Sequence, residues 1–274
     1  MARVEPVVGE PAAVADLGTG RALLVADVHA GIEVALRYER GVELESRAEE
    51  RRERLCGLIG RTEADRLVVL GDLAHRIAAP DGEDLDELDR LIGAVTDRVP
   101  MTLVEGNHDG GVAAAFADEI DVIGPAGGTL GDAASENSDG GVGVLHGHTW
   151  PDPSLRATDV VCMGHEHPQV RLADAVGGAR TERAWLRGPL DPSACFEGDS
   201  HPDTLASDVT ASDVTTPGVT APDLVVFPAF NERSGGTWVN VEDGSFLSPF
   251  LPDGLPSGDA YLLDGTRLGD FRRV

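Results

Sequence analysis

Aspartate, asparagine and histidine residues recur at the points where short apolar runs of this sequence end. They form five segments: Asp27-Val28-His29, Gly71-Asp72, Gly106-Asn107-His108-Asp109, His146-Gly147-His148 and Gly164-His165-Glu166-His167. Seven of the eight histidines lie in or within four residues of these segments, and only His201 lies elsewhere. Histidines that served packing or solubility alone would be scattered, so the clustering indicates one shared site.

The residue types of these segments predict a metal site. Carboxylate, amide and imidazole groups are oxygen and nitrogen ligands that suit Mn²⁺, Fe or Zn²⁺. In a D-x-H or H-x-H pair the two side chains share a face, because alternate residues of an extended chain do. A lone aspartate after a glycine, as at Asp72, can bridge two ions. Two ions about 3.5–4 Å apart can activate a water and stabilise charge on a phosphoryl group. Because no serine or cysteine stands beside a histidine in a nucleophile motif, water is the expected nucleophile.

The first half of the chain alternates strand and helix patterns that would position these segments. Apolar runs predict strands at 21–26, 66–70 and 101–104. Helices are expected at 46–62 and 85–95, the second from apolar residues three or four positions apart. This alternation favours an α/β fold with parallel pairing. In open α/β sheets, ligands bind at the carboxyl ends of the strands, where the five segments lie.

The second half has shorter apolar runs and longer polar connections. Further strands are expected at 142–145, 160–163, 224–227 and 237–241. Residues 131–141 and 197–222 read as flexible surface insertions, and the latter contains a crude Asp-Val-Thr repeat with little to bury. Because strand patterns resume after each insertion, we expect a single domain over residues 1–274. The tail from Leu251 suggests no function.

The charge of the chain is strongly negative. It has 48 acidic residues against 22 basic ones, a net charge of −26, and every basic residue is arginine. At about 1 M salt the Debye length falls to about 3 Å, which screens this repulsion. The composition therefore predicts a halophilic source. Three cysteines without a CxxC motif predict reduced thiols. No secretory signal and no run of roughly 20 apolar residues is found, so we expect a soluble cytoplasmic protein.

The ordered series D-x-H, G-D, G-N-H-D, H-G-H and G-H-x-H resembles the calcineurin-like metallophosphoesterase family. A closer resemblance is to archaeal phosphoesterases distantly related to the double-strand-break repair nuclease, and to bacterial phosphoesterases associated with DNA ligase. It is carried by ADVHAGIEVALRYERG at the first motif, GDLAH at the second and PAFNERSGGTWVN at 228–240. The implied fold is α/β, with two mixed sheets packed face to face and flanked by helices in a four-layer α/β/β/α sandwich.

The resemblance also implies two sets of ligands that share Asp72. One ion would be held by Asp27, His29, Asp72 and His167. The second would be held by Asp72, Asn107, His146 and His165. His108 would contact the phosphate and help to protonate the leaving oxygen. Many family members read G-D-x-x-D at the second motif, where the later aspartate supports the catalytic histidine. Here that position is His75, which leaves the partner of His108 open.

Several residues beside these ligands have roles that the sequence leaves open. His75 and His148 either contact substrate or form hydrogen bonds behind the ligands, and Asp109 is expected to orient its loop. Glu166 should point away from the ions. Trp150 is either a wall of the cleft or a core residue, and Phe230 with Asn231 is placed near the site by the resemblance. The acidic and basic side chains of 47–54 are expected to be a solvated helix face.

The resulting function is two-metal-dependent hydrolysis of a phosphodiester, in a nucleotide or nucleic acid, by a metal-bridging water. Mn²⁺ is the first expectation, with Fe²⁺, Ni²⁺ or Zn²⁺ as alternatives. The lack of a dense basic stripe argues against nucleic acid, although counterion release adds little to affinity at molar salt. Two alternatives remain: a phosphomonoesterase or small-nucleotide hydrolase with the same centre, and a non-catalytic metal-binding scaffold. Such a scaffold would be expected to lack His108 or a bridging ligand.

Overall fold

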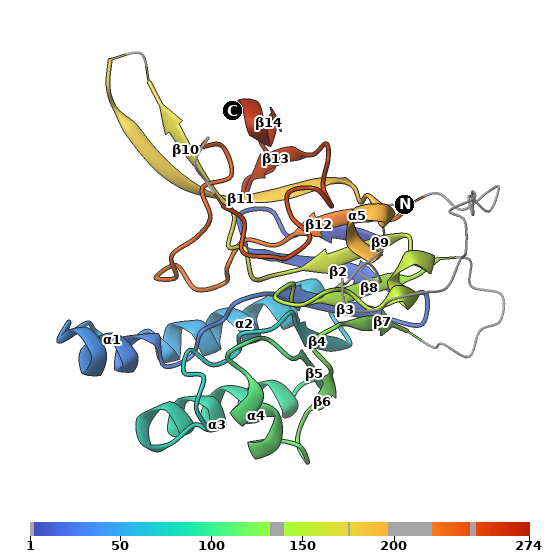
Figure 1. Cartoon of the computed structure of the whole chain (residues 1–274). Coiled ribbons are helices and arrows are strands. Elements are labelled where there is room, and N and C mark those ends of the chain that lie inside the picture. Colours follow the sequence, from blue (N-terminus) through green and yellow to red (C-terminus); the bar gives the residue numbers. More distant parts are fainter. Residues whose placement is uncertain (1–2, 132–139, 175, 197–220, 242–244) are drawn as a thin grey trace, which may run out of the picture.

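The computed structural model describes residues 3–131, 140–174, 176–196, 221–241 and 245–274. Most of the two expected insertions, 131–141 and 197–222, lies outside these residues. The chain forms two mixed β-sheets that pack face to face, with α1 and α2 to the left and α3 and α4 at the bottom in Figure 1. The two mixed sheets and flanking helices expected from the resemblance are confirmed.

The first sheet has six strands in the order β1-β2-β3-β4-β5-β6. Their bounds are β1 Val4–Pro6, β2 Ala12–Asp16, β3 Arg21–Val25, β4 Arg66–Val69, β5 Met101–Val104 and β6 Asp121–Ile123. The helices that cover its outer face are α2 Ala48–Thr62, α3 Gly82–Thr96 and α4 Gly110–Ala115, whereas α1 Ile32–Arg40 extends to the left in Figure 1. Strands β3 to β6 pair in parallel, as the strand–helix alternation predicted, whereas β1 and β2 add an antiparallel edge.

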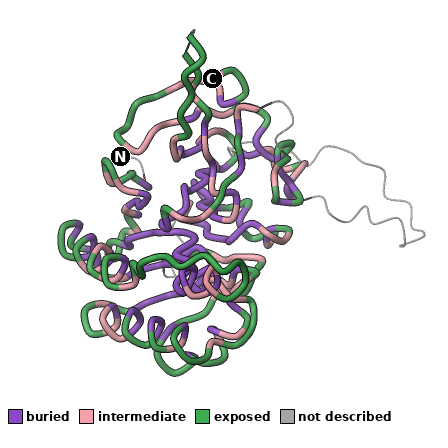
Figure 2. Tube along the Cα trace, turned by 90° about the vertical axis from the view of Figure 1, so that its left-hand side faces the viewer, coloured by how far each residue is buried: buried purple, intermediate pink, exposed green. Residues whose placement is uncertain are grey.

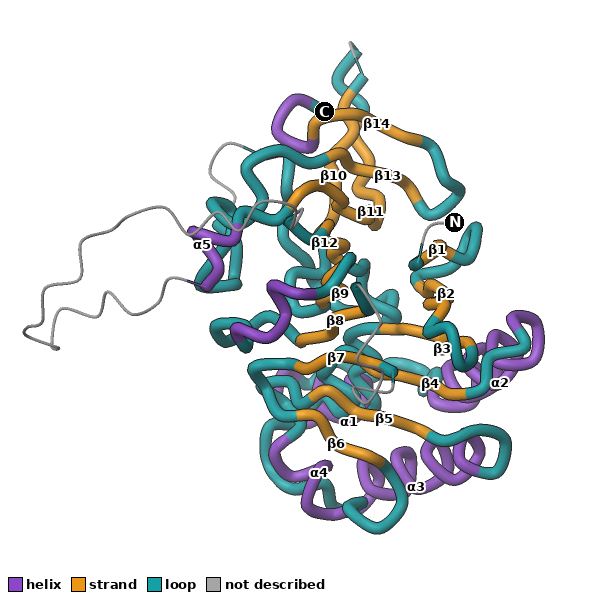
Figure 3. Tube along the Cα trace, turned by 90° about the vertical axis from the view of Figure 1, so that its right-hand side faces the viewer, coloured by secondary structure: helices purple, strands orange, loops and turns teal. Residues whose placement is uncertain are grey.

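The second sheet has the order β14-β13-β11-β12-β9-β8-β7, and β10 pairs with β11 beside this path. Its strands are β7 Gly128–Leu130, β8 Val142–Leu145, β9 Val160–Met163, β10 Gln169–Ala173, β11 Ala179–Pro189, β12 Asp223–Val226, β13 Asp259–Leu262 and β14 Arg267–Asp270. Strands β8, β9 and β12 are parallel neighbours. The short helix α5 (Pro192–Phe196), the 3-10 turns η1 (Pro153–Ala157) and η2 (Phe271–Arg273) and loops cover the outer face, as Figure 3 shows.

Three apolar clusters fill the three interfaces between layers. Along β3, Leu23 and Val25 pack against the helices. Leu24 points to the opposite side and belongs to the cluster between the two sheets, which also contains Trp185 and Phe227. The third cluster lies between the second sheet and its covering loops. In Figure 2 the buried residues accordingly run through the middle of the molecule. The cysteines are unpaired, and in the described part of the chain no helix is long and apolar enough to cross a membrane.

Two interpretations of local sequence were wrong. Residues 237–241 form no strand: Trp238 makes only an isolated bridge to Gln169 at the start of β10, and the amide of Thr237 bonds to the loop residue Glu166. The helix face at 47–54 is not wholly solvated, because Arg51 is buried between Glu33 and Glu87, with contacts of 2.7 and 2.6 Å. This ion network joins α2 to the start of α1 and to α3.

Candidate metal centre

The five polar segments meet where β3, β4, β5, β8 and β9 end, at the line between the two sheets. Backbone hydrogen bonds hold the loops together, for example from the amide of His29 to the carbonyl oxygen of Asp72 at 2.9 Å. Glycines permit the backbone of these loops to lie close to the side chains of the site. A Cβ on Gly71 would lie 2.2 Å from Nδ1 of His146, and one on Gly106 would lie 2.3 Å from Oδ1 of Asp72. The glycines of the G-D and G-N-H-D motifs are therefore required by packing against the site.

The first set of potential ligands surrounds Nε2 of His167. Nδ1 of His167 lies 2.8 Å from the carbonyl oxygen of Gly235 and donates to it, which leaves the lone pair of the neutral ring on Nε2. This nitrogen lies 3.1 Å from Oδ1 of Asp27 and 3.4 Å from Nε2 of His29. When His167 is protonated, its Nε2 donates to Asp27, and when it is neutral these acceptor atoms repel one another unless a cation lies among them. The donor atoms therefore fit a cation.

The second set is built in the same way around His146, which is fully buried. Its Nδ1 donates to the carbonyl oxygen of Leu70 at 2.8 Å, so Nε2 carries the lone pair. Nε2 lies 3.2 Å from Oδ1 of Asn107, 3.2 Å from Nδ1 of His165 and 3.4 Å from Oδ1 of Asp72. Four oxygen and nitrogen atoms converge here, and the mixture suits a borderline or hard divalent ion.

Asp72 lies between the two sets. Its Oδ1 faces His146, whereas its Oδ2 lies 3.9 Å from Nε2 of His29. Each carboxylate oxygen thus faces one set. The structure brings together all seven residues that the sequence suggested as ligands, and Asp27 also lies close to Asp72 and His146. That they bind ions stays a prediction.

The histidine pKa values show how strongly each set attracts positive charge. Burial acts to lower the pKa of His146, but the hydrogen bond and charge of Asp72 outweigh it and raise this pKa to about 9. Burial also acts to lower the pKa of His167, yet the charge of Asp27 raises it to about 8. Burial lowers the pKa of His29 to about 3 and that of His165 to about 4. One histidine of each set therefore favours its protonated form, while the others favour the neutral form that a metal requires.

The backbone of the site is strained. Five of the seven potential ligands have positive φ angles, namely Asp27 (57°), His29 (45°), Asp72 (51°), His165 (69°) and His167 (44°). A side chain in this left-handed region costs roughly 1–2 kcal/mol. Strain of this kind persists where the surrounding structure fixes it, and it is concentrated at functional sites.

This strain predicts that His29→Gly leaves the metal-free protein more stable than His29→Ala by about 1 kcal/mol. Both variants remove the same imidazole, but only glycine accepts a φ of 45° without a Cβ clash. Denaturant unfolding of the two chelated variants in molar KCl measures the difference. The matched control is the same pair at His146, which is equally buried but has no positive φ, and there alanine should be the more stable residue. Equal stabilities at position 29 would contradict the strain.

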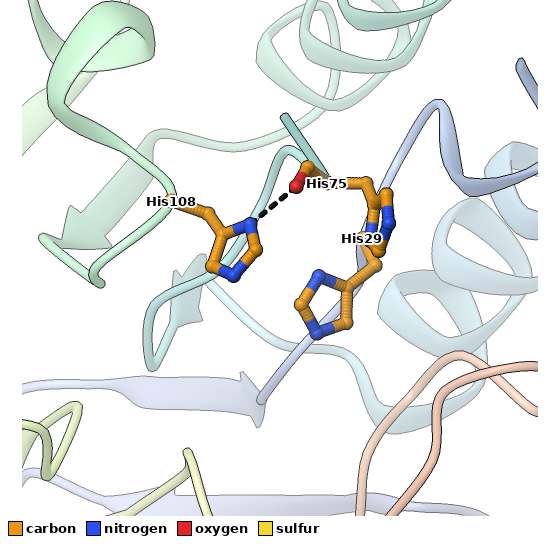
Figure 4. Close-up of side chains that lie close together, drawn as sticks. All are labelled: His29, His75 and His108. Atoms are coloured by element: carbon orange, nitrogen blue, oxygen red, sulfur yellow. Dashed lines mark hydrogen bonds between the residues drawn. The ribbon is translucent and has the colours of Figure 1, made fainter. Parts of the chain in front are cut away.

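His108 stands beside the first set, and its partner is the backbone of His75. Nδ1 of His108 is hydrogen-bonded to the carbonyl oxygen of His75, drawn as the dashed line in Figure 4. Nε2 of His108 lies 3.8 Å from Oδ2 of Asp72. The ring of His75 turns away toward His29, with 5.2 Å between the ring centroids. A backbone carbonyl thus occupies the role that the resemblance gave to a carboxylate.

Asp109 and His148 flank the two sets. Oδ1 of Asp109 accepts hydrogen bonds from the amides of Leu73 and Ala74, and Oδ2 accepts one from Gly106. The side chain thereby ties the second motif to the third. Burial, together with the charge of Asp72, raises the pKa of Asp109 to about 6. His148 packs against His146 with 5.3 Å between ring centroids, and its buried Nδ1 has no hydrogen-bond partner among the residues that the structure describes.

Glu166 and Asn231 hold loops against the centre. The carboxylate of Glu166 points away from the ligands and accepts hydrogen bonds from the amides of Leu247 and Ser248 and from Oγ1 of Thr237. Nδ2 of Asn231 donates to the carbonyl oxygens of Val28 and His29 at 3.0 and 3.2 Å. Sequence patterns could not reveal the role of Glu166, because its partners lie about 70 to 80 positions away.

A cleft of about 790 Å³ opens beside the first set. Its inner wall contains His29, His75, His108 and His167, and its outer wall contains Leu36, Arg40, Arg233, Trp238 and Leu247. Trp150, a suggested wall residue, is not among the residues that line this cleft and instead packs near Phe250. The outer wall was missed in the sequence, where Trp238 was assigned to a strand.

Comparison with known proteins agrees with the fold. Residues 20–202 match the model of the calcineurin-like phosphoesterase family, which is more than half of the chain, so the protein belongs to this family. It is accordingly a metal-dependent hydrolase of phosphate esters. A search of functionally curated proteins gives no match.

Two solved structures are similar to the chain. The crystal structure of Pseudomonas putida nuclease MPE has 18% sequence identity and a TM-score of 0.51, over 97% of this chain and 100% of that one. Yfce, a phosphoesterase from E. coli, has 24% identity and a TM-score of 0.35, over 56% of this chain and 74% of that one. At this identity the likeness to nuclease MPE shows the shared fold alone.

Proposed function

We propose that this protein hydrolyses phosphodiesters, using two divalent cations held by the two ligand sets, with Mn²⁺ as the first choice. The observation that carries the proposal is the convergence of acceptor atoms on both sides of Asp72, with His108 beside them. Asp27, His29, Asp72 and His167 would hold one cation, and Asp72, Asn107, His146 and His165 the other. When bound, the cations supply the Lewis acidity that activates water and stabilises phosphoryl charge.

His108 handles the proton of the leaving group. Because its Nδ1 is engaged by the carbonyl oxygen of His75, Nε2 is the atom free to exchange a proton with the substrate. Protonated at Nε2, the imidazolium donates to the leaving oxygen as the ester bond breaks. The amide of His108 also donates to Oδ1 of Asp72 at 3.0 Å, which fixes the ring relative to both ligand sets.

The charges of the cleft favour a diester over a monoester. Of the two cleft arginines, Arg233 is paired with Glu33 at 2.7 Å. Arg40 has no ion pair with any residue that the structure describes, and the carboxylates of Glu39 and Glu166 also line the cleft. A monoester dianion would need more positive charge than this, whereas a diester carries a single negative charge. The cleft also leaves room for a second ester substituent beyond the metal centre.

The proposal predicts turnover of bis-p-nitrophenyl phosphate that requires added Mn²⁺ and is abolished by a chelator. We expect kcat/KM for p-nitrophenyl phosphate to be at least about tenfold lower, which corresponds to about 1.4 kcal/mol of transition-state binding. The assay is best made in molar KCl, because the net charge of −26 suggests the cytoplasm of a halophilic archaeal cell. Fe²⁺, Ni²⁺ and Zn²⁺ are tested in parallel.

The outcomes separate the alternatives. Turnover of the monoester alone would replace the diesterase by a phosphomonoesterase. Folded protein that binds metal but hydrolyses neither ester with any of the four ions would support a non-catalytic scaffold instead.

A further inference from the structure

The outer wall of the cleft exposes a tryptophan next to the metal centre. The side chain of Trp238 is 45% exposed, whereas Trp185 in the core is 3% exposed. Leu247, on the same wall, is 59% exposed, and Leu36 from α1 also lines the cleft. Large apolar side chains that stay in water inside a cleft give up the stabilisation of burial, so their position indicates a ligand with an apolar face.

The segment that carries Trp238 is held firmly although it is a loop. On one side, the amide of Thr237 donates to the carbonyl oxygen of Glu166 at 3.1 Å. On the other, Gln169 and residues 237 and 239 exchange backbone hydrogen bonds of 2.9 and 3.0 Å. The carbonyl oxygen of Gly235 accepts the hydrogen bond from His167. One rigid unit therefore orients a potential metal ligand and presents Trp238 to the cleft.

The charge of the protein makes this wall important for substrate affinity. At the molar salt that screens the net charge of −26, neither long-range attraction nor counterion release contributes much to the binding of a phosphate ester. Stacking of an aromatic side chain on a base does not depend on attraction between net charges, so high salt does not screen it. An acidic phosphoesterase can therefore hold a nucleoside substituent by stacking where basic side chains are few.

We propose that Trp238 stacks on a nucleobase of the substrate, so that the preferred diester carries a nucleoside next to the scissile phosphate. This assignment rests on the proposed phosphodiesterase function and names the class of substituent that the cleft accepts. Arg40 lines the same cleft.

The test compares two substrates with the same leaving group: thymidine 5′-(p-nitrophenyl phosphate) and methyl p-nitrophenyl phosphate. For Trp238→Ala we expect kcat/KM for the thymidine ester to fall about tenfold or more, while kcat/KM for the methyl ester stays within about twofold of the unsubstituted protein. Trp238→Phe keeps an aromatic face and should retain most of the preference. Trp150→Ala is the matched control, because Trp150 is 48% exposed but lies outside the cleft lining.

A second readout needs no turnover. Millimolar adenosine monophosphate should quench the tryptophan fluorescence of the chelated protein, and the quench should vanish in Trp238→Phe and persist in Trp150→Phe. Equal losses on both esters in Trp238→Ala, or a quench that survives in Trp238→Phe, would overturn the stacking role while leaving the phosphodiesterase intact. If neither ester is hydrolysed by the unsubstituted protein, the proposed function fails, and the quench alone then decides whether Trp238 binds a base.

Discussion

His108→Ala is expected to lower kcat for a phosphodiester by about 10²–10⁴-fold while the bound metal is unchanged. The imidazole lies beside both ligand sets, but its Nδ1 is engaged by the carbonyl oxygen of His75, and its Nε2 is 3.8 Å from Asp72. Removing it therefore takes away a proton donor without removing a ligand. The measurements are steady-state kinetics with bis-p-nitrophenyl phosphate and metal content after gel filtration.

The control for this variant is His75→Ala. His108 contacts the backbone of position 75, so alanine there keeps the carbonyl that orients the catalytic ring. We expect its loss of kcat to be much smaller than that of His108→Ala. If His75→Ala were equally inactive, the imidazole of His75 itself would be needed. A His108→Ala protein that kept full activity would remove the general acid from the proposal.

The strands that deliver the site could be predicted because each is a short, fully buried run that ends in a polar motif. Strands β5, β8 and β9 begin and end where the apolar runs do, since both faces of each are covered. The β10–β11 hairpin was not predicted. Its outer part is exposed on both faces, so no apolar run marks it, and in Figure 1 it projects from the body of the molecule. Strands β13 and β14 are only partly buried and gave no signal either.

The side-chain composition of the centre could be predicted, but its supports could not. Ligand types follow from chemistry, so Asp27, Asp72 and His146 stand out in the sequence. Every residue has a backbone carbonyl, so the sequence cannot indicate which one accepts a hydrogen bond. The partner of His108, the carbonyl oxygen of His75, therefore could not be predicted. The cleft wall at Trp238 depends in the same way on hydrogen bonds to Glu166 and Gln169, which fold a strand-like pattern into a loop.

Asp72→Asn is expected to lower the bound metal from two ions per chain toward one, and kcat/KM by about 10³-fold. Two metal ions that share a bridging ligand supply several kcal/mol of transition-state stabilisation, and each 1.36 kcal/mol changes the rate tenfold. Oδ1 of Asp72 faces His146 and Oδ2 faces His29, so both oxygens are engaged. An asparagine keeps one oxygen and turns an amide hydrogen pair toward the other set, which therefore loses one metal-facing acceptor.

The matched variant is Asn107→Asp, which replaces an amide by a carboxylate, the reverse of the change in Asp72→Asn. Asn107 contacts only the second set, through Oδ1 at 3.2 Å from His146, and aspartate keeps that oxygen. It should therefore keep both ions, as measured by atomic emission on gel-filtered protein. Unfolding of each chelated variant shows whether it is folded. Two ions and full activity in Asp72→Asn would mean that the two sets bind metal independently, and Asp72 would then be a neighbour of both ions without bridging them.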